Sequence, residues 1–593
     1  MQKNKKSKLP VWKLENIYKS PNDPQIDIDL DQIEKKVDEF CKKYNTIDKP
    51  YLNNTDLLLQ ALQDNERMND EIIDKPIFYL SRLLTIDSGN SNALAKSAIV
   101  SNRHSKILNN LTFFSISLGK ISKDNQVKFL SEPKLIHYKQ LLKRVFEQAK
   151  YNLTESEEKI LSLKSLPSYE SWVNGNDKIL GKRSIIWKNK KLPLTLATKK
   201  ISQTKSAKER AKLNELVNIE LGHVSEFSEA EINAIFTDKK IDDELRGFEK
   251  PYSATLLMND NEATVIENLI DVVSAHNHIA HKFYKLKAKI HKLKYLKYYE
   301  RSLKVDESKT KFTFDDSVKR LKQMYSELNP EYIKYLDTYI KEGAIDAEIK
   351  VGKKVGAYCA SSHKITTHIM LNHDDTLNAF LTFAHEMGHA IHSEMSKKQS
   401  VIYEDYSISL AETASTLFEK IAFDSVIKDL DKKSKIIFLH NKISDSISTI
   451  FRQVACFKFE LELHNTIRAK GYVDNNEILN IHNRNMSAYM GPSVKFENSD
   501  GLSYVSWPHL RYFFYVYTYA YGLLVSMTLL QKYKQDKSFW KSIEQFLSAG
   551  SSESPENILR KIGIDLKDKS VFEGGLKIIE NDVNELEKLL KAK

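Results

Sequence analysis

The scarcity of helix-breaking residues constrains the fold of this chain more than any other feature of the sequence. Only 18 glycines and 13 prolines are spread over 593 positions, well below the roughly 7% and 5% of an average protein. Glycine and proline are the residues that most disfavour the interior of a helix, so their rarity favours long helices. We therefore predict a mainly α fold.

Local patterns agree with this prediction and add one exception. Apolar residues recur at helical spacing over 27–44, and Thr154 with Glu157 forms a capping box that opens a helix through Leu166. Residues 351–359 and 366–371 are instead β-branched or aromatic, with turn-like residues between them. We read them as two short strands, which predicts a small β-sheet within the helical fold.

The sequence marks a boundary between domains only weakly. Residues 167–215 are less regular than their surroundings and contain many polar and basic positions. We therefore expect an N-terminal helical lobe over residues 1–200 and a larger second domain over residues 201–593.

The net charge of +11 raises the question of a nucleic-acid partner. The densest basic segment, residues 282–304, is interleaved with Phe283, Leu286, Ile290 and Leu293. Those four residues fall at helical spacing, which favours a buried stripe with the lysines on the solvated side. We expect no nucleic-acid partner.

One uncharged run, residues 512–530, is long enough to approach a membrane span. Its tyrosines are spread over the whole run, whereas membrane helices place tyrosine at their two interfaces. Each hydroxyl would also need a partner in lipid. We therefore predict a buried helix and no membrane association.

The cysteines and the N-terminus indicate the compartment. Cys41, Cys359 and Cys456 are few and far apart, which argues against a disulfide framework. Residues 1–19 contain lysines and lack the apolar stretch of a secretory signal. We expect a cytoplasmic protein.

The segment His385–His389 reads His-Glu-Met-Gly-His and has the spacing of a metal-binding helix. Residues four apart lie on one face of a helix, so His385 and His389 can share an ion while Glu386 leans over the open coordination position. Gly388 costs up to about 1 kcal/mol relative to alanine in mid-helix. Either another backbone packs closely there or the glycine is simply tolerated.

A catalytic zinc ion needs three protein ligands and one open position. Residue 395, where one zinc-peptidase pattern has a third histidine, is a methionine. The third ligand should therefore be a carboxylate from a second helix, and Glu404, Glu412 and Glu419 are candidates. Glu412 lies in a stretch of small residues that could pack tightly on the first helix. Glu419 is either a partner of a ligating histidine or a solvated charge.

The motif and its surroundings resemble the thimet-type M3 family of zinc metallopeptidases, and within it the oligoendopeptidase F group. The resemblance is strongest over about residues 350–525 and extends along nearly the whole chain. The matching segments are 12–14, 17–18, 356–359, 385–392, 405–408, 411–416, 508–509, 514–517 and 519–520. Two positions depart from the family pattern: Tyr521 stands where threonine is frequent, and Cys359 where serine is common.

The resemblance implies a gluzincin-type catalytic domain over residues 201–593, with two helical lobes enclosing a deep substrate channel. It implies one Zn²⁺ per chain, with Glu412 as the third ligand. It also implies that a strand edge formed by Gly356, Ala357, Tyr358 and Cys359 binds an extended peptide. His509 and a nearby tyrosine would contact the transition state; Tyr515 is the first choice, followed by Tyr519 and Tyr512.

The resulting hypothesis is an endopeptidase that cleaves internal bonds of short oligopeptides. A water molecule activated by the metal would attack the peptide bond, and Glu386 would act as its general base. Two alternatives remain open at this point: a metallocarboxypeptidase of a related helical zincin type, and a catalytically inactive protein that binds peptides.

Overall fold

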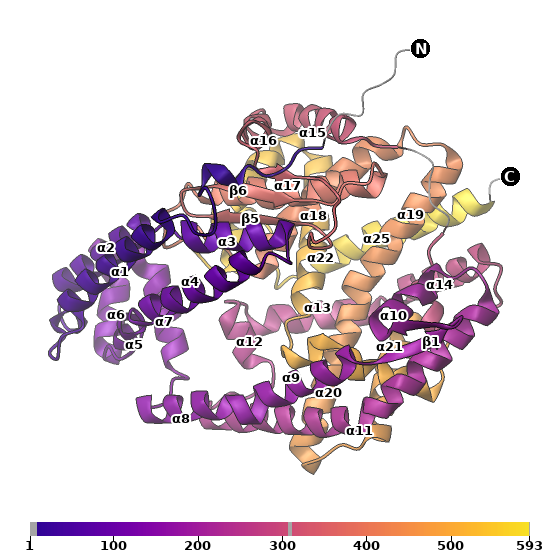
Figure 1. The fold of residues 1–593 in the computed structure, drawn as a ribbon, viewed down its shortest axis with the longest axis horizontal. Helices are drawn as coiled ribbons and strands as arrows, with labels where there is room; N and C mark the ends of the chain where they lie inside the picture. The colour runs from indigo at the N-terminus through magenta and orange to yellow at the C-terminus, as the bar shows by residue number, and fades with distance from the viewer. Residues whose placement is uncertain (1–8, 306–310, 592–593) are drawn as a thin grey trace. The chain divides into compact units, whose positions relative to one another are not determined.

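The fold is mainly helical, as the sequence predicts (Figure 1). A computed structural model describes residues 9–305 and 311–591. The first eight residues of the segment that we searched for a secretory signal therefore lie outside the described part. Among the described residues, the strands form one three-stranded sheet and two two-stranded sheets.

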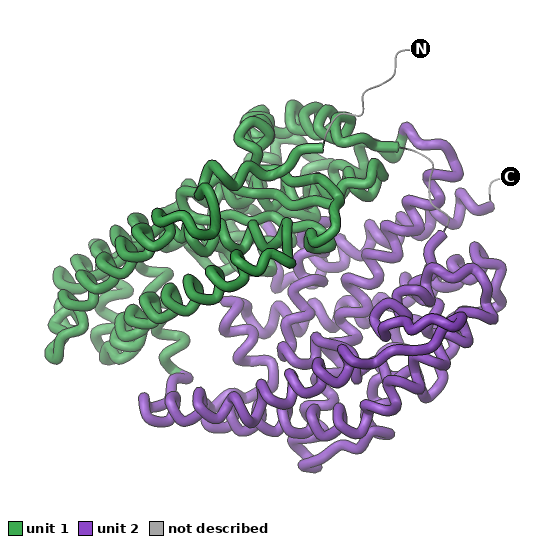
Figure 2. Tube along the Cα trace, in the orientation of Figure 1, with its two compact units in different colours: residues 1–150, 310–428, 529–563 green, residues 151–309, 429–528, 564–593 purple. Residues whose placement is uncertain are grey.

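The chain folds into two compact units, each assembled from separate segments of the sequence (Figure 2). Unit 1 contains residues 1–150, 310–428 and 529–563, and unit 2 contains residues 151–309, 429–528 and 564–593. Residue 200 lies inside unit 2, whereas the two predicted domains are consecutive in sequence. The predicted division into an N-terminal lobe, residues 1–200, and a second domain, residues 201–593, stays a prediction.

Unit 1 contains helices from all three of its sequence segments, and its three-stranded sheet comes from the second segment. Its helices are α1 (Gln25–Tyr44), α2 (Thr55–Glu71), α3 (Lys75–Ile86), α4 (Ser91–Asn109), α5 (Thr112–Gly119), α6 (Lys123–Ser131), α7 (Lys139–Ala149), α15 (Phe314–Leu328), α16 (Glu331–Glu342), α17 (Leu377–Ser396), α18 (Ile408–Ile427), α23 (Trp540–Leu547) and α24 (Pro555–Lys561). Buried side chains of α1, α2, α5, α6 and α7 form one hydrophobic core.

The sheet of unit 1 has the order β4 (Ile345–Asp346), β6 (Ile365–Met370), β5 (Tyr358–Ser362). Strand β4 pairs with β6 in parallel, and β5 pairs with β6 antiparallel, with Cys359 opposite Ile369. The indole N–H of Trp12 donates to the carbonyls of Ala344 and Ile369, at 3.0 and 3.1 Å. Helix α17 packs on β5 and β6, so the sheet and this helix are held as one assembly (Figure 1).

The two predicted strands are present, but the first is shorter than the sequence suggests. Strand β5 begins at Tyr358, and residues 351–357 form turns and irregular backbone. Gly352 and Gly356 have φ angles of +85° and +89°. These angles lie in the left-handed region, which glycine adopts readily and which a β-strand does not contain. Valine residues in this segment suggested a strand, and the two glycines prevent it.

Unit 2 is built from helices α8 (Glu155–Ser165), α9 (Ser171–Gly181), α10 (Leu194–Gln203), α11 (Ala207–Arg246), α12 (Ser253–Met258), α13 (Ala263–Ala275), α14 (Asn277–Ile290), α19 (Lys432–Ile447), α20 (Gln453–Lys470), α21 (Asn475–Met490) and α25 (Ser570–Lys591). Helix α22 (Tyr517–Gln535) begins in unit 2. Strands β1 (Ser184–Trp187) and β2 (Lys190–Pro193) form a hairpin, and β3 (Leu296–Lys297) pairs with β7 (Val494–Lys495). The predicted capping box, Thr154 with Glu157, opens α8.

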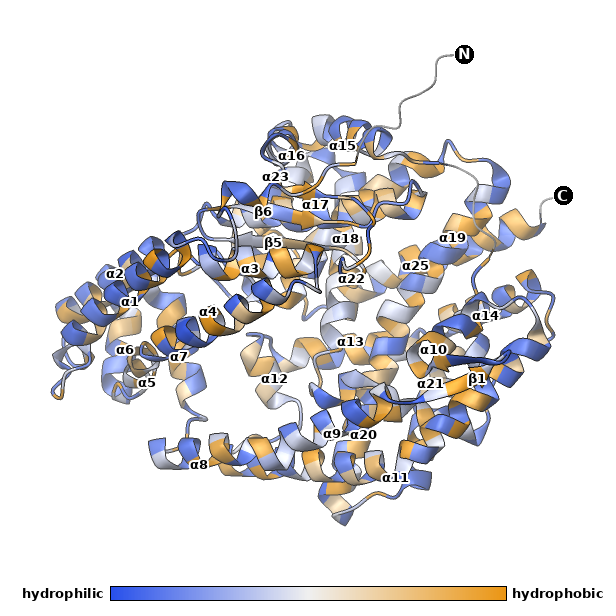
Figure 3. Ribbon diagram, viewed as in Figure 1, coloured by the Kyte–Doolittle hydropathy of each residue, from blue (hydrophilic) through white to orange (hydrophobic). Residues whose placement is uncertain are grey.

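Hydrophilic and hydrophobic residues are mixed along helices such as α1, α2 and α11 (Figure 3). In the basic segment, Phe283 and Leu286 are buried as predicted. Lys287 is an exception to the predicted solvated face, because it is fully buried and its ammonium donates to the Arg301 carbonyl at 2.6 Å. Helix α14 ends at Ile290, before Leu293.

The uncharged run at residues 512–530 lies mostly in α22, and many of its side chains are buried. The hydroxyl of Tyr517 donates to the Asn261 side chain at 2.8 Å, which satisfies a buried polar group. Across residues 9–305 and 311–591, we find no helix with the length and apolar character needed to cross a bilayer.

Candidate active site

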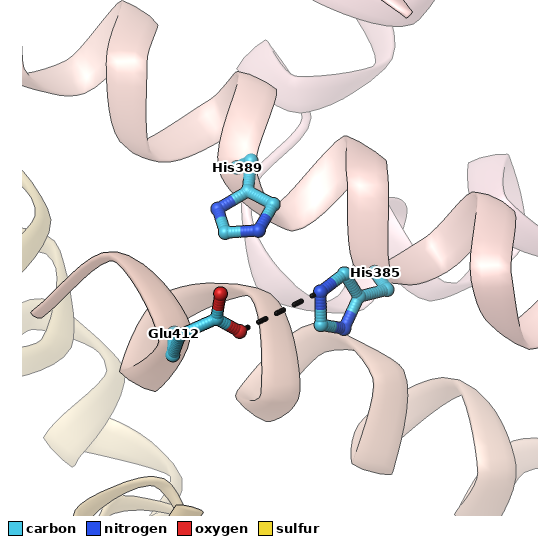
Figure 4. Close-up of side chains that lie close together, drawn as sticks. All are labelled: His385, His389 and Glu412. Carbon is cyan, nitrogen blue, oxygen red and sulfur yellow. Dashed lines mark ion pairs between the residues drawn. The ribbon is translucent and has the colours of Figure 1, made fainter. Parts of the chain in front are cut away.

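Three side chains of unit 1 form a cluster with the composition of a metal site (Figure 4). His385 and His389 lie one turn apart on α17, with ring centroids 5.0 Å apart, and Glu412 comes from the neighbouring α18. One donor atom from each residue lies within 4.8 Å of the other two. The Nε2 atom of His385 is 3.8 Å from the Glu412 carboxylate. Two imidazoles and a carboxylate are a ligand set that suits a divalent metal ion.

The close approach of α17 and α18 depends on Gly388. A Cβ atom built on Gly388 would lie 2.8 Å from the Cα of Ser415 and 3.2 Å from the Phe418 side chain. The first of these distances is shorter than real Cβ contacts show. Of the two readings of this glycine, close backbone packing is therefore correct. The small residues around Glu412 allow the same approach from the other helix.

The other two candidate carboxylates have different neighbours. Glu419, two turns beyond Glu412 on α18, lies with one carboxylate oxygen 2.9 Å from Nδ1 of His385. This bond orients the imidazole and leaves Nε2 toward Glu412, as in many histidine–metal sites. Glu404 lies 2.9 Å from Nδ1 of His363 and is outside the cluster.

The charges around the two histidines favour a cation at this place. Burial lowers the pKa of His385, but the Glu419 hydrogen bond and the surrounding carboxylates raise it to about 9. The pKa of His389 falls to about 3, because of burial and the charge of His385. The same negative potential that holds a proton on His385 would stabilise a metal ion there.

Glu386 lies beside the metal cluster and is only 6% exposed. Burial, partly offset by the charge of His385, raises the pKa of Glu386 to about 7. The backbone N–H of Cys359 forms a hydrogen bond with the Glu386 carboxylate. Strand β5 and α17 therefore meet at this carboxylate, which can take up or release a proton near neutral pH.

A cavity of about 940 Å³ in unit 1 joins the metal cluster to strand β5. His385, Glu386, His389 and Glu412 line it together with Ala357, Tyr358 and Cys359 of the predicted substrate segment. Gly356 is exposed and is not part of this lining. Strand β5 is an edge strand of its sheet. An edge strand beside a cavity can pair with an extended peptide.

His509 and the three tyrosines that were predicted as transition-state contacts all lie in unit 2. His509 precedes α22, and its Nδ1 atom is in hydrogen-bond contact with the Tyr515 hydroxyl. The ring centroids of Tyr515 and Tyr519 are 5.8 Å apart, and those of His509 and Tyr519 are 6.3 Å apart. Tyr512 is 66% exposed and stands apart as the least enclosed of the three tyrosines. Burial lowers the pKa of His509, and the charge of Arg452 lowers it further.

The sequence as a whole matches a known family of peptidases. The model of the family described as "Peptidase family M3" matches residues 223–578, which is more than half of the chain. The chain belongs to peptidase family M3. A second model, described as "Oligopeptidase F", matches residues 118–182.

Individual relatives agree with this assignment to family M3. An oligoendopeptidase F homologue from Borreliella burgdorferi is 26% identical, with 100% of each chain covered. A homologue from Lactococcus lactis is 27% identical over 81% of each chain. Family membership and these relatives identify the M3 chain as a metallo-oligopeptidase.

Solved structures share the fold of this M3 chain. A crystal structure from Chlamydophila abortus matches with a TM-score of 0.84 and 24% identity, covering 98% of each chain. Oligoendopeptidase-F from Enterococcus faecium matches with a TM-score of 0.70 and 19% identity, covering 96% of this chain and 100% of that one.

Sequence reasoning missed one feature of the M3 chain, the turn that carries Tyr515. Phe513 and Phe514 both have positive φ angles, 33° and 59°, which is rare for bulky residues and marks a constrained backbone. Thr255 donates to the Phe513 carbonyl at 3.0 Å, and the Phe514 N–H donates to the buried Glu460 at 2.8 Å. A Phe-Phe pair carries no sequence signal for such a turn.

Proposed function

We propose that this M3 chain is a zinc-dependent endopeptidase that hydrolyses internal peptide bonds of short oligopeptides. The observation that carries the proposal is the convergence of His385, His389 and Glu412 beside the buried carboxylate of Glu386. A protein that only bound peptides would have no need of this combination.

The metal would be held by His385, His389 and Glu412, one Zn²⁺ per chain. Their donors, two imidazoles and one carboxylate, match zinc better than magnesium or calcium, which prefer oxygen ligands. When bound, the ion would supply Lewis-acid polarisation of the peptide carbonyl and lower the pKa of a water molecule. Glu419 would position His385 through their 2.9 Å hydrogen bond.

Glu386 would be the general base of the reaction. Its carboxylate would take a proton from the attacking water and pass it to the leaving amine. Burial raises the pKa of Glu386 to about 7 without a metal ion, and a bound cation would lower it toward the ionised form that a general base needs. The N–H of Cys359 would keep the carboxylate in place.

Tyr515 and His509 would donate hydrogen bonds to the oxyanion that develops on the peptide carbonyl, in exchange for the bond that they make with each other. Tyr515 remains the first choice, because its hydroxyl touches His509 and the N–H of the preceding Phe514 donates to Glu460. Tyr519 is the second choice. Tyr512, with its side chain largely in solvent, is the weakest candidate.

Short peptides would bind in extended form along β5, with Tyr358 and Cys359 beside the metal cluster. Gly356 and Ala357 precede the strand, so their part in binding would come from the turn rather than from strand pairing. The deep substrate channel, the cytoplasmic location and the absence of a nucleic-acid partner stay predictions.

Replacement of the general base tests the proposal. The variant Glu386→Gln should bind zinc normally and lose hydrolysis of a fluorogenic peptide. The control is Glu394→Gln on the same helix; Glu394 accepts from the Thr367 hydroxyl at 2.7 Å, a bond that glutamine can keep. The control should cleave normally. Wild-type turnover by Glu386→Gln would refute the assignment.

Two further measurements separate the alternatives. A peptide-binding protein without activity would show no hydrolysis that a chelator abolishes. A metallocarboxypeptidase would release single C-terminal residues and would not cleave a peptide with a blocked C-terminus. Cleavage-site mapping on blocked and free peptides distinguishes both from an endopeptidase.

A further inference from the structure

A second cavity, of about 490 Å³, lies in unit 2 and has His509 in its wall. Arg301 and Arg452 line it, together with Tyr298, Trp507 and Asp500. The proposed mechanism uses only His509 of this group. The remaining lining residues therefore have no function in the reaction as described so far.

The charge of this cavity is mainly positive. Arg301, Arg452 and the exposed Lys199 contribute three cationic groups. Asp500 is the acidic residue of the lining, and one of its oxygens accepts the Glu497 backbone N–H at 2.7 Å. Within the described ranges, neither Arg301 nor Arg452 forms an ion pair with a carboxylate. Arg301 acts on Asp500 through electrostatics without an ion-pair contact. A ligand that brought a carboxylate into contact would therefore stabilise both partly buried guanidinium groups.

Aromatic rings hold both guanidinium groups. The Arg301 guanidinium lies 4.0 Å from the centroid of the Tyr298 ring, and its Nη1 atom donates to the Tyr298 carbonyl at 3.0 Å. The Arg452 guanidinium lies 5.2 Å from the centroid of the Trp507 ring, and its buried Nε atom has no hydrogen-bond partner. Stacking on an aromatic face orients a guanidinium and leaves its N–H groups for a planar anion.

We propose that this cavity binds a carboxylate of the peptide substrate through Arg301 and Arg452. The inference rests on the proposed function, because His509 connects the cavity to the reaction. The carboxylate can be the C-terminal α-carboxylate or an acidic side chain; both offer two oxygens to a guanidinium fork. Recognition of the α-carboxylate would favour peptides that have a free C-terminus over peptides with a blocked one.

Binding to the full-length Glu386→Gln variant tests the site without turnover. Three labelled peptides of one sequence are compared: one with a free C-terminus, one amidated, and one amidated with glutamate at the last position. The free acid should bind about tenfold more tightly than the plain amide, as expected for a hydrogen bond to a charged group. Tight binding of the glutamate amide would show that a side-chain carboxylate also serves. Equal affinity for all three peptides would overturn the proposal.

Substitution of the arginines assigns the preference to this cavity. Arg452→Met and Arg301→Met should each reduce the acid-to-amide ratio from about tenfold toward one. Lys200→Met is the control: Lys200 is exposed and next to Lys199, but does not line the cavity. It should keep the full ratio. An unchanged ratio in both arginine variants would contradict the proposal, with melting curves confirming that they fold.

Failure of this inference can be told apart from failure of the proposed function. If the wild-type chain cleaves acid and amide peptides equally well, the carboxylate site is wrong and the peptidase assignment stands. If Glu386→Gln still cleaves the peptides during the binding assay, the proposed general base is wrong. The ratio measured for the wild-type chain decides the first question even where an arginine variant fails to fold.

Discussion

Gly388 is the position where the structure makes the sharpest prediction. A glycine-to-alanine change in an exposed helix interior stabilises a protein by up to about 1 kcal/mol. At Gly388, however, the added Cβ would lie 2.8 Å from the Ser415 Cα, and ordinary contact begins at 3.4 Å. Helices α17 and α18 would have to separate by the difference, about 0.6 Å, and overpacking of this kind costs about 1–3 kcal/mol. This cost outweighs the gain in helix propensity.

The same movement would disturb the metal cluster, because the two histidines lie on α17 and Glu412 on α18. Metal–ligand distances tolerate changes of only about 0.2 Å, which is less than the required separation. We expect Gly388→Ala to weaken zinc binding at least about tenfold and to lower the melting temperature.

Zinc affinity by chelator competition and thermal melting measure the two effects separately. The control is Gly222→Ala in α11, where an added Cβ would meet no atom within 4 Å. This control should be neutral or more stable. If Gly388→Ala binds zinc like the wild type and melts higher, the idea that this glycine sets the helix separation is wrong.

Three further predictions follow from the site. Replacing Glu419 by alanine should weaken zinc binding by about 10–100-fold, because the His385 ring loses its orienting bond; an unchanged zinc affinity would make Glu419 an ordinary helix charge. Tyr515→Phe should lower kcat by about 10²–10³ with zinc retained, whereas Tyr512→Phe should behave like the wild type. Burial raises the pKa of Glu460 to about 8 from 4.5. The native state thus keeps a proton that the unfolded chain loses, and this contribution to stability is complete below about pH 4.5 and lost as the pH rises through 8. Urea denaturation between about pH 5 and 8 should show that the wild type loses up to about 1.4 kcal/mol per pH unit more than Glu460→Gln does; equal pH profiles would contradict this assignment.

The metal cluster could be predicted because its determinants are local. Residues four apart on one helix must share a face, so the spacing of His385 and His389 fixed their relation before any tertiary contact was known. The small residues around Glu412 indicated a helix that could approach closely, and they distinguished Glu412 from Glu404. The bond between Glu419 and His385 was only one of two open readings, because it depends on how α18 is rotated against α17.

The features that escaped prediction depend on tertiary contacts. Lys287 lies in a basic run whose spacing indicates a solvated face. Its hydrogen-bond partner, the Arg301 carbonyl, lies 14 residues further along the chain, beyond the reach of helical spacing. The Phe513–Phe514 turn depends on Thr255 and Glu460, which belong to distant segments. Each unit is assembled from separate segments because remote parts of the chain contact one another. Composition along the sequence does not reveal such contacts.

The electrostatics of the cluster explain why these residues read as a cation site rather than as structural ion pairs. Glu386, Glu412 and Glu419 all act on the same partly buried imidazole, that of His385. The charges of Glu412 and Glu419 add electrostatic repulsion at the buried Glu386. A raised pKa for Glu386 relieves part of it by protonation, and a divalent cation between the histidines and Glu412 would relieve the rest. This repulsion at Glu386 is therefore a cost without the ion, and the ion would convert part of it into binding energy.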